Sequence, residues 1–202
     1  MEPLHQVREC TDSDSPAPGR RQGRHETGYF TLSGDVNSEM VRRVFDAIGK
    51  MTANGTRTAH LLLQSNGGYV SDGICLYNMM THAPIEFVMY NCGAVASIAV
   101  TLYLAGQQRV ASDTARFMIH KSHATAPQGA RPDALKIIAD GLMADDRRTE
   151  TILRRHIRLT DEMWQVHAYS DLHLAATEAL GTGLIHRIGE FAPPAGHVMH
   201  NI

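Results

Sequence analysis

Apolar residues in this chain follow two spacings that alternate along it. Short continuous apolar runs, typical of buried strands, are separated by stretches in which apolar residues recur at helical spacing. The runs that predict strands are 29–32, 60–64, 85–90, 109–111, 115–119 and 184–188. The stretches that predict helices are 40–51, 70–80, 98–105, 132–159, 160–169 and 175–180. Strands that alternate with helices require right-handed crossovers, so the predicted fold class is α/β with a mainly parallel sheet.

The predicted elements fill one central region of the chain and leave two tails. Residues 1–27 are rich in Ser, Pro, Gly, Arg and Asp, with too little apolar surface to offset the entropy lost on ordering, so we expect a flexible tail. Residues 28–189 predict one domain, because a chain of 202 residues is long enough for one well-developed core. Residues 190–202 contain Pro and Gly and predict a loose C-terminal tail.

Composition and charge argue against several classes of protein. A net charge of -2 gives no general reason to expect nucleic acid or an anionic membrane as a partner. Three cysteines form neither an even framework nor a CxxC pair, so we expect no disulfide and no metal site. No apolar run reaches the roughly 18 to 20 residues that a membrane span needs. The N-terminus also lacks a signal-peptide core, which predicts a cytoplasmic protein.

Three segments with useful chemistry follow predicted strands. They are the turn at 66–68, Ser97 and His120. Because parallel strands end at one edge of a sheet, where α/β proteins place their ligands, we expect these three segments to lie together.

Ser97 lies where a strand turns into a helix, and this position has two interpretations. Gly93 permits a sharp turn, while the small residues Ala94 and Ala96 let other backbone approach closely. A hydroxyl at this point lies near unpaired backbone N–H groups and the positive end of the helix dipole, which suits a nucleophile. Serine is also a common helix N-cap, and this stretch alone does not separate the two interpretations.

A serine hydroxyl becomes a nucleophile when a base takes its proton and a third group orients that base. For Ser97 the candidate base is His120, at the end of a strand, and the candidate orienting carboxylate is Asp171. The backbone N–H groups of Gly68 and Ile98 are candidate oxyanion donors, because a Gly-Gly turn admits substrate closely and Ile98 begins a helix. This chemistry needs no metal ion and no cofactor.

The same residues also have purely structural interpretations. His120 is one of twelve histidines, and His123 is a near rival, although it lies in the polar segment 121–131 where no strand fixes its position. Asp171 could cap the helix that follows it, and 66–68 could be only a turn.

Four short motifs occur in an order that resembles the proteolytic subunit of the Clp protease family. Ser-Asn-Gly-Gly at 65–68 is similar to the family's Ser-Pro-Gly-Gly, and Gly-Ala-Val-Ala-Ser at 93–97 is similar to its Gly-x-Ala-Ala-Ser. Met-Ile-His at 118–120 matches the segment that carries the family's histidine. Asp171 precedes Glu-Ala-Leu-Gly-Thr-Gly-Leu-Ile at 178–185, which resembles the family's Glu-Ala-x-x-x-Gly-Leu-Val/Ile.

The resemblance implies more than the spacing does. It implies a crotonase-like fold, a superhelix of repeated β-β-α units, in which 132–159 is a protruding handle helix. It also implies rings of this chain, as a heptamer or double heptamer. A partner AAA+ unfoldase would use ATP and deliver peptide or unfolded protein. It assigns the triad and the oxyanion N–H groups to Ser97, His120, Asp171, Gly68 and Ile98.

Three features depart from the family pattern. The family's N-terminal segment is replaced by the tail at 1–27, which bears on unfoldase docking. The family's glycine-rich strand after the histidine is replaced by 121–127, in which Pro127 cannot donate to a ladder, so substrate pairing and the double ring are affected. Asn66 stands for a proline and Ala99 for a glycine.

Three functional hypotheses follow. The first is a serine endopeptidase that works through an acyl-enzyme. The second is a crotonase-like enzyme that uses only the oxyanion hole on acyl-CoA thioesters, against which the presence of His120 and Asp171 argues. The third is a weakly active or regulatory paralogue that joins rings of an active subunit, which the altered segments 1–27 and 121–127 favour.

Overall fold

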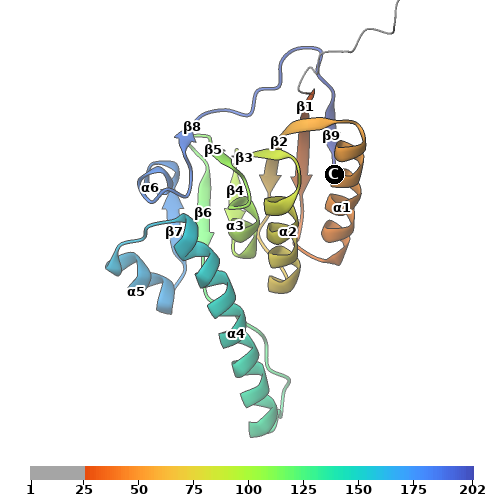
Figure 1. Ribbon diagram of the computed structural model, residues 1–202. Coiled ribbons are helices and arrows are strands. Elements are labelled where there is room, and N and C mark those ends of the chain that lie inside the picture. The colour runs from red at the N-terminus through yellow and green to blue at the C-terminus, as the bar shows by residue number, and fades with distance from the viewer. Residues whose placement is uncertain (1–25) are drawn as a thin grey trace, which may run out of the picture.

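The computed structural model describes residues 26–202, which form two sheets and six helices (Figure 1). The strands are β1 (Glu26–Ser33), β2 (Thr56–Gln64), β3 (Glu86–Asn91), β4 (Ala94–Ala96), β5 (Gln108–Ala111), β6 (Arg116–Ile119), β7 (Leu172–Ala175), β8 (Arg187–Ile188) and β9 (Met199–Asn201). The helices are α1 (Ser38–Ala53), α2 (Val70–His82), α3 (Ile98–Tyr103), α4 (Pro132–His156), α5 (Asp161–Tyr169) and α6 (Ala176–Gly181).

The larger sheet has the strand order β8-β5-β3-β2-β1-β9, and every neighbouring pair in it is parallel. The smaller sheet has the order β4-β6-β7, in which β4 and β6 are parallel while β6 and β7 are antiparallel. The predicted α/β class with a mainly parallel sheet is therefore confirmed.

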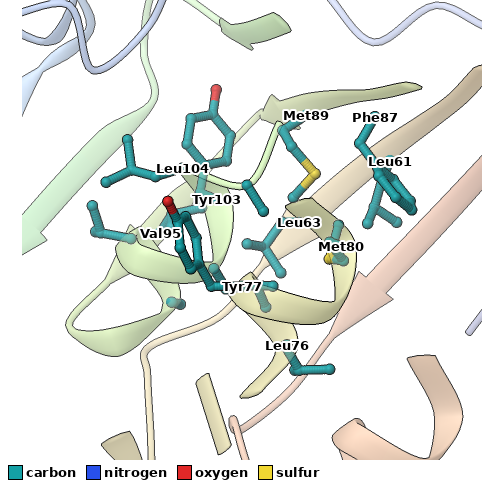
Figure 2. Packing of buried hydrophobic residues seen from close by; sticks show 14 of the residues in the cluster. Leu61, Leu63, Leu76, Tyr77, Met80, Phe87, Met89, Val95, Tyr103 and Leu104 are labelled. Carbon is teal, nitrogen blue, oxygen red and sulfur yellow. The ribbon is translucent and has the colours of Figure 1, made fainter. Parts of the chain in front are cut away.

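The core lies between the larger sheet and helices α1, α2 and α3, which run along one of its faces (Figure 1). Helix α1 begins where the Asn37 side chain accepts a hydrogen bond from the Met40 N–H at 3.0 Å, just before the apolar stripe predicted over 40–51. Figure 2 shows the side chains that meet in this core, including Leu61, Leu63, Leu76, Tyr77, Met80, Phe87, Met89 and Tyr103.

The opposite face of the larger sheet is only partly covered. There a small cluster of Val88, Tyr90 and Val110 packs with Leu62 and with Phe191 from the C-terminal segment. His60 and Leu62 keep intermediate exposure, so the run 60–64, which the sequence predicts as a buried strand, is fully buried on one face only. The physical reason is that the helices α1 to α3 cover the other face of the sheet.

Several element boundaries differ from the predictions. The sequence pattern missed β4 and β7, which are short strands that pair with β6. The strand predicted over 184–188 is confined to β8, and the helix predicted over 132–159 ends at His156. Short strands carry too few residues for a period-2 pattern, so their partners in the tertiary fold decide whether they form.

The sequence predicts a loose tail over 190–202, and the end of this segment pairs with the larger sheet. Strand β9 pairs in parallel with β1, with Tyr29 opposite Met199 and Thr31 opposite Asn201. The guanidinium of Arg43 also donates a hydrogen bond to the Ile202 carbonyl oxygen at 2.8 Å. The flexible tail predicted over 1–27 lies outside the described residues, except that 26 and 27 belong to β1.

Helix α4 extends away from the sheets as a protruding arm, as the resemblance implies for the handle helix (Figure 1). It is 25 residues long and opens with Pro132 in its first turn, where a missing N–H costs no hydrogen bond. No helix among residues 26–202 is both long enough and apolar enough to cross a membrane.

Arg109 in β5 is a buried cation that links the strand to the loop before β8. Its guanidinium donates to the carbonyl oxygens of Leu184 (2.8 Å), Gly106 (3.0 Å) and Gly183 (3.0 Å). Because these carbonyls would lose their partner in the buried site, we expect Arg109→Ala to lower the free energy of unfolding by about 3 kcal/mol. Chemical denaturation measures this loss, with the exposed Arg147→Ala as a control that stays within about 0.5 kcal/mol of wild type. Equal stability of the two variants would contradict the prediction.

Candidate active site

Ser97 lies between β4 and α3 in a backbone conformation that serine rarely adopts. Its φ is 56° and its ψ is -135°, and it is the one non-glycine residue with positive φ in the described part of the chain. Its N–H donates to the Met118 carbonyl oxygen at 2.8 Å, and its own carbonyl oxygen accepts from the Val100 N–H at 3.0 Å. Such strain costs about 1–3 kcal/mol and persists where the surrounding structure holds it.

The hydroxyl of Ser97 does not cap helix α3. Ser97 occupies the N-cap position, but its side chain makes no capping hydrogen bond. The N-cap interpretation of this serine is therefore wrong for its side chain, and the hydroxyl points to a different partner.

That partner is His120. Its Nε2 atom lies 2.7 Å from the Ser97 Oγ, a hydrogen-bond distance. The two residues meet because β4 and β6 pair in parallel with Ala96 opposite Met118, so both strands end at the same edge. His123, the rival histidine, lies beside His120 with ring centroids 5.1 Å apart and makes no hydrogen bond to Ser97 in the described structure.

The surroundings of His120 favour its neutral form. Burial is the largest cause that lowers its pKa from 6.5, and the neighbouring His123 lowers it further. The carboxylates of Asp171 and Asp146 act in the opposite direction. The net shift is downward, so the imidazole is ready to accept a proton at neutral pH.

Asp171 follows α5 and lies opposite His120 in the pairing of β6 with β7. The last paired residues of that ladder are Ile119 and Leu172, and the next positions along the two strands are His120 and Asp171. Since β7 and not a helix follows Asp171, its alternative interpretation as a helix cap is wrong. Within residues 26–202 its carboxylate makes no hydrogen bond to His120, so Asp171 acts on the imidazole through its charge.

The turn at 66–68 brings backbone directly against Ser97. A Cβ on Gly67, at φ +105°, would lie 2.6 Å from the Ser97 Cβ. A Cβ on Gly68, at φ +152°, would lie 2.2 Å from the Val36 carbonyl oxygen. Both positions thus require glycine.

Two backbone donors belong to residues that line the cavity at Ser97. The N–H groups of Gly68 and Ile98 donate to no protein acceptor among the described residues. Both residues line the same cavity as Ser97 and His120. Unpaired N–H groups beside a nucleophile can stabilise a negatively charged oxygen.

The cavity in front of Ser97 has a volume of about 470 Å³ and a wall of mixed polar and apolar side chains. Apolar side chains from α2, α3, β6 and α4 line it, namely Val70, Ile98, Ile119, Leu142 and Leu153. Sequence reasoning missed the contribution of α4, because its apolar spacing signals a buried face without showing what that face covers. A second cavity of about 580 Å³ lies between α1, β1 and β9, and Ser97 does not line it.

Comparison with known proteins identifies the family. Residues 25–191 match the family model described as Clp protease, which is most of the chain.

The chain belongs to the Clp protease family.

Relatives of known identity agree with this assignment. The chain is 30% identical over 172 residues to the ATP-dependent Clp protease proteolytic subunit of Acorus calamus, covering 82% of this chain and 83% of the relative. It is 27% identical over 160 residues to the ATP-dependent Clp protease proteolytic subunit 2 of Corynebacterium glutamicum, covering 78% and 79%. The chain is thus a Clp-type peptidase, and membership of the family favours this over the acyl-CoA enzyme and the regulatory paralogue.

A solved structure shares the fold. A ClpP1 mutant from Listeria monocytogenes superposes with a TM-score of 0.69, covering 82% of this chain and 91% of the other, at 20% sequence identity. The ClpP-like, crotonase-like fold that the sequence motifs imply is therefore confirmed.

Proposed function

We propose that this Clp protease family member is a serine endopeptidase in which Ser97 is the nucleophile and His120 the general base. The observation that carries the proposal is the 2.7 Å contact between the His120 Nε2 and the Ser97 Oγ. Asp171 is the orienting acid, acting on the imidazole through its charge, and the N–H groups of Gly68 and Ile98 form the oxyanion hole.

The reaction divides peptide hydrolysis into two steps. As the Ser97 Oγ attacks the peptide carbonyl carbon, its proton passes to the His120 Nε2, and the carbonyl oxygen becomes an oxyanion that accepts hydrogen bonds from Gly68 and Ile98. Collapse of this intermediate breaks the C–N bond, and the imidazolium gives its proton to the leaving amine. Water, deprotonated by His120, then hydrolyses the acyl-Ser97 ester. The negative charge of Asp171 stabilises the imidazolium in both steps.

Substrate and assembly follow the family. The names of the relatives describe subunits of an ATP-dependent Clp protease. We expect this chain to form rings, as a heptamer or double heptamer, that enclose Ser97. An AAA+ unfoldase would hydrolyse ATP and supply unfolded protein in the cytoplasm. The cavity of about 470 Å³ in front of Ser97 would hold a side chain of the peptide next to the scissile bond.

A fluorophosphonate probe tests the nucleophile directly. Such a probe reacts with a serine whose hydroxyl is activated by a base and beside an oxyanion hole. We expect one adduct, found on Ser97 by mass mapping of proteolytic peptides. The same chain unfolded by heat serves as the control and should not react. A folded wild-type protein that stays unlabelled, or carries its label on another serine, would overturn the proposal.

The pH dependence of labelling tests the base. Because burial and His123 lower the pKa of His120, and the reactive form is neutral, the labelling rate should be half-maximal below pH 6.5. His123→Asn removes an influence that lowers this pKa, so the midpoint should move up. Asp171→Asn removes a carboxylate that raises it, so the midpoint should move down. Rates measured from about pH 5 to 8 separate these outcomes, and shifts in the reverse directions would contradict the assignment.

A further inference from the structure

The segment that follows His120 has little backbone structure of its own. Residues 121–131 form neither helix nor strand. In the described chain, the one backbone-to-backbone hydrogen bond that joins two residues of this segment links the Ala130 N–H to the Pro127 carbonyl oxygen at 3.1 Å. Contacts other than backbone hydrogen bonds must therefore hold the chain immediately after the histidine, because an unrestrained backbone at this point would leave the position of the imidazole variable.

Two carboxylates of α4 provide that restraint. The Ser122 N–H donates to the Asp146 Oδ1 at 2.7 Å. The Lys121 ammonium donates to the Glu150 Oε2 at 2.9 Å, and both side chains of this pair are about two-thirds buried. Asp146 and Glu150 are four residues apart on one helix, so both face the segment after His120.

Glu150 is itself held in place by a second cation. It accepts a hydrogen bond from Arg154 at 2.8 Å, one turn further along α4. The guanidinium of Arg154 in turn stacks over the ring of Trp164 in α5, 3.9 Å from its centroid. The hydrogen bond from Lys121 is the main cause that lowers the pKa of Glu150, so the carboxylate is charged at neutral pH.

Asp171 makes no hydrogen bond to His120 among the described residues, so the chain on either side of the histidine also has to hold the imidazole in place. On its N-terminal side, His120 is fixed by the ladder between β6 and β7. On its C-terminal side, the contacts to Asp146 and Glu150 are the first that hold the chain. A shift of about 1 Å at a catalytic group can cost on the order of 100-fold in rate.

We propose that Asp146 is a positioning residue for His120, with Glu150 as a second anchor, and that α4 thereby sets the distance between the imidazole and the Ser97 hydroxyl. This inference rests on the proposed peptidase chemistry of Ser97 and His120. The proposal depends on the hydrogen bond that Asp146 accepts from the Ser122 N–H. The amide oxygen of an asparagine can accept the same hydrogen bond.

Three variants separate this hydrogen bond from charge and from general stability. Asp146→Ala removes the acceptor, and Asp146→Asn keeps an acceptor without the charge. Asp140→Ala removes an exposed carboxylate of the same helix that pairs with Lys136. The first readout is the plateau rate of fluorophosphonate labelling at high pH. We expect Asp146→Ala to lose about tenfold, while Asp146→Asn and Asp140→Ala stay within about threefold of wild type.

The pH at which the labelling rate is half-maximal is a second readout, and general destabilisation of the protein would not change it. Because the Asp146 carboxylate raises the pKa of His120, both Asp146 variants should move the midpoint down, and Asp140→Ala should leave it unchanged. The groups that face His120 in all variants are His123 and Asp171, together with Lys121 and His167 nearby. A plateau in Asp146→Ala equal to wild type, or an equal loss in Asp146→Asn, would overturn the proposal.

NMR of ¹³C-labelled histidine decides the inference independently of catalysis. The His120 ring signal is assigned by its absence in His120→Gln. At pH values where His120 is neutral, we expect this signal to shift or broaden in Asp146→Ala. It should keep its wild-type position in Asp146→Asn and Asp140→Ala. A wild-type protein that does not react with the fluorophosphonate would overturn the proposed peptidase chemistry. An unchanged His120 NMR signal in Asp146→Ala would instead overturn the positioning role of Asp146.

Discussion

Ser97→Ala should lower the rate of peptide cleavage by about 10⁴-fold or more while the protein stays folded, because removal of a nucleophile leaves only the residual effect of the oxyanion hole. The variant keeps the Cβ atom and hence the strained backbone at φ 56°. Its melting temperature should therefore remain close to that of wild type. Cleavage of a fluorogenic peptide and a thermal melt measure the two effects.

A second substitution at the same residue tests the strain. Ser97→Gly should be as inactive as Ser97→Ala, but glycine tolerates positive φ without steric cost. We expect it to be more stable than Ser97→Ala by about 1 kcal/mol. Ser38→Ala, on the exposed first turn of α1, is the matched control and should keep full activity. Cleavage by Ser97→Ala at more than about a tenth of the wild-type rate would contradict the nucleophile assignment.

Gly68→Ala should damage both activity and stability. A Cβ at this position would lie 2.2 Å from the Val36 carbonyl oxygen, which belongs to backbone and cannot rotate away. Val36 and Gly68 form a parallel bridge, and the Tyr69 N–H donates to the same carbonyl at 2.8 Å. Relief of the clash would turn the Gly68 N–H out of the proposed oxyanion hole. Loss of one such donor costs about 10²- to 10³-fold in rate.

Comparison of Gly68→Ala with Gly34→Ala separates the effect of the clash from the effect of a positive φ. Gly34 has a φ of +109°, but a Cβ there would meet no atom within 4 Å. Both variants should lose stability from the positive φ, by about 1–2 kcal/mol, and Gly68→Ala should lose more. Gly34→Ala should keep wild-type cleavage. Peptide turnover and chemical denaturation compare them, and wild-type turnover in Gly68→Ala would contradict the role of its N–H.

The longer elements of the fold were predictable because their signals are local. Helix α1 has both an Asn37 cap and an apolar stripe at helical spacing, and β2 and β3 are apolar runs of adequate length. Strands β4 and β7 were not predictable, since each is only three or four residues long and exists because β6 lies between them. Strand β9 likewise forms because β1 offers a free edge to Met199–Asn201.

The residues of the proposed site could be named from the sequence, whereas the distances between them could not. The sequence by itself determined that Gly68, Ser97 and His120 follow strands, which brings them to one edge of the fold. Only the tertiary structure decided that the Ser97 hydroxyl leaves the helix end and meets the His120 Nε2 at 2.7 Å. That outcome depends on the pairing of β4 with β6.

Two further features were also decided only by the tertiary structure. Within residues 26–202, Asp171 lies close enough to His120 to affect it by charge but makes no hydrogen bond to it, while Asp146 accepts a hydrogen bond from the backbone two residues beyond the histidine. Residues 122 and 146 belong to different elements, and no local pattern reports how a long helix packs against a loop. Local spacing determines which residues can form a helix or a strand, whereas distances between side chains depend on how those elements pack together.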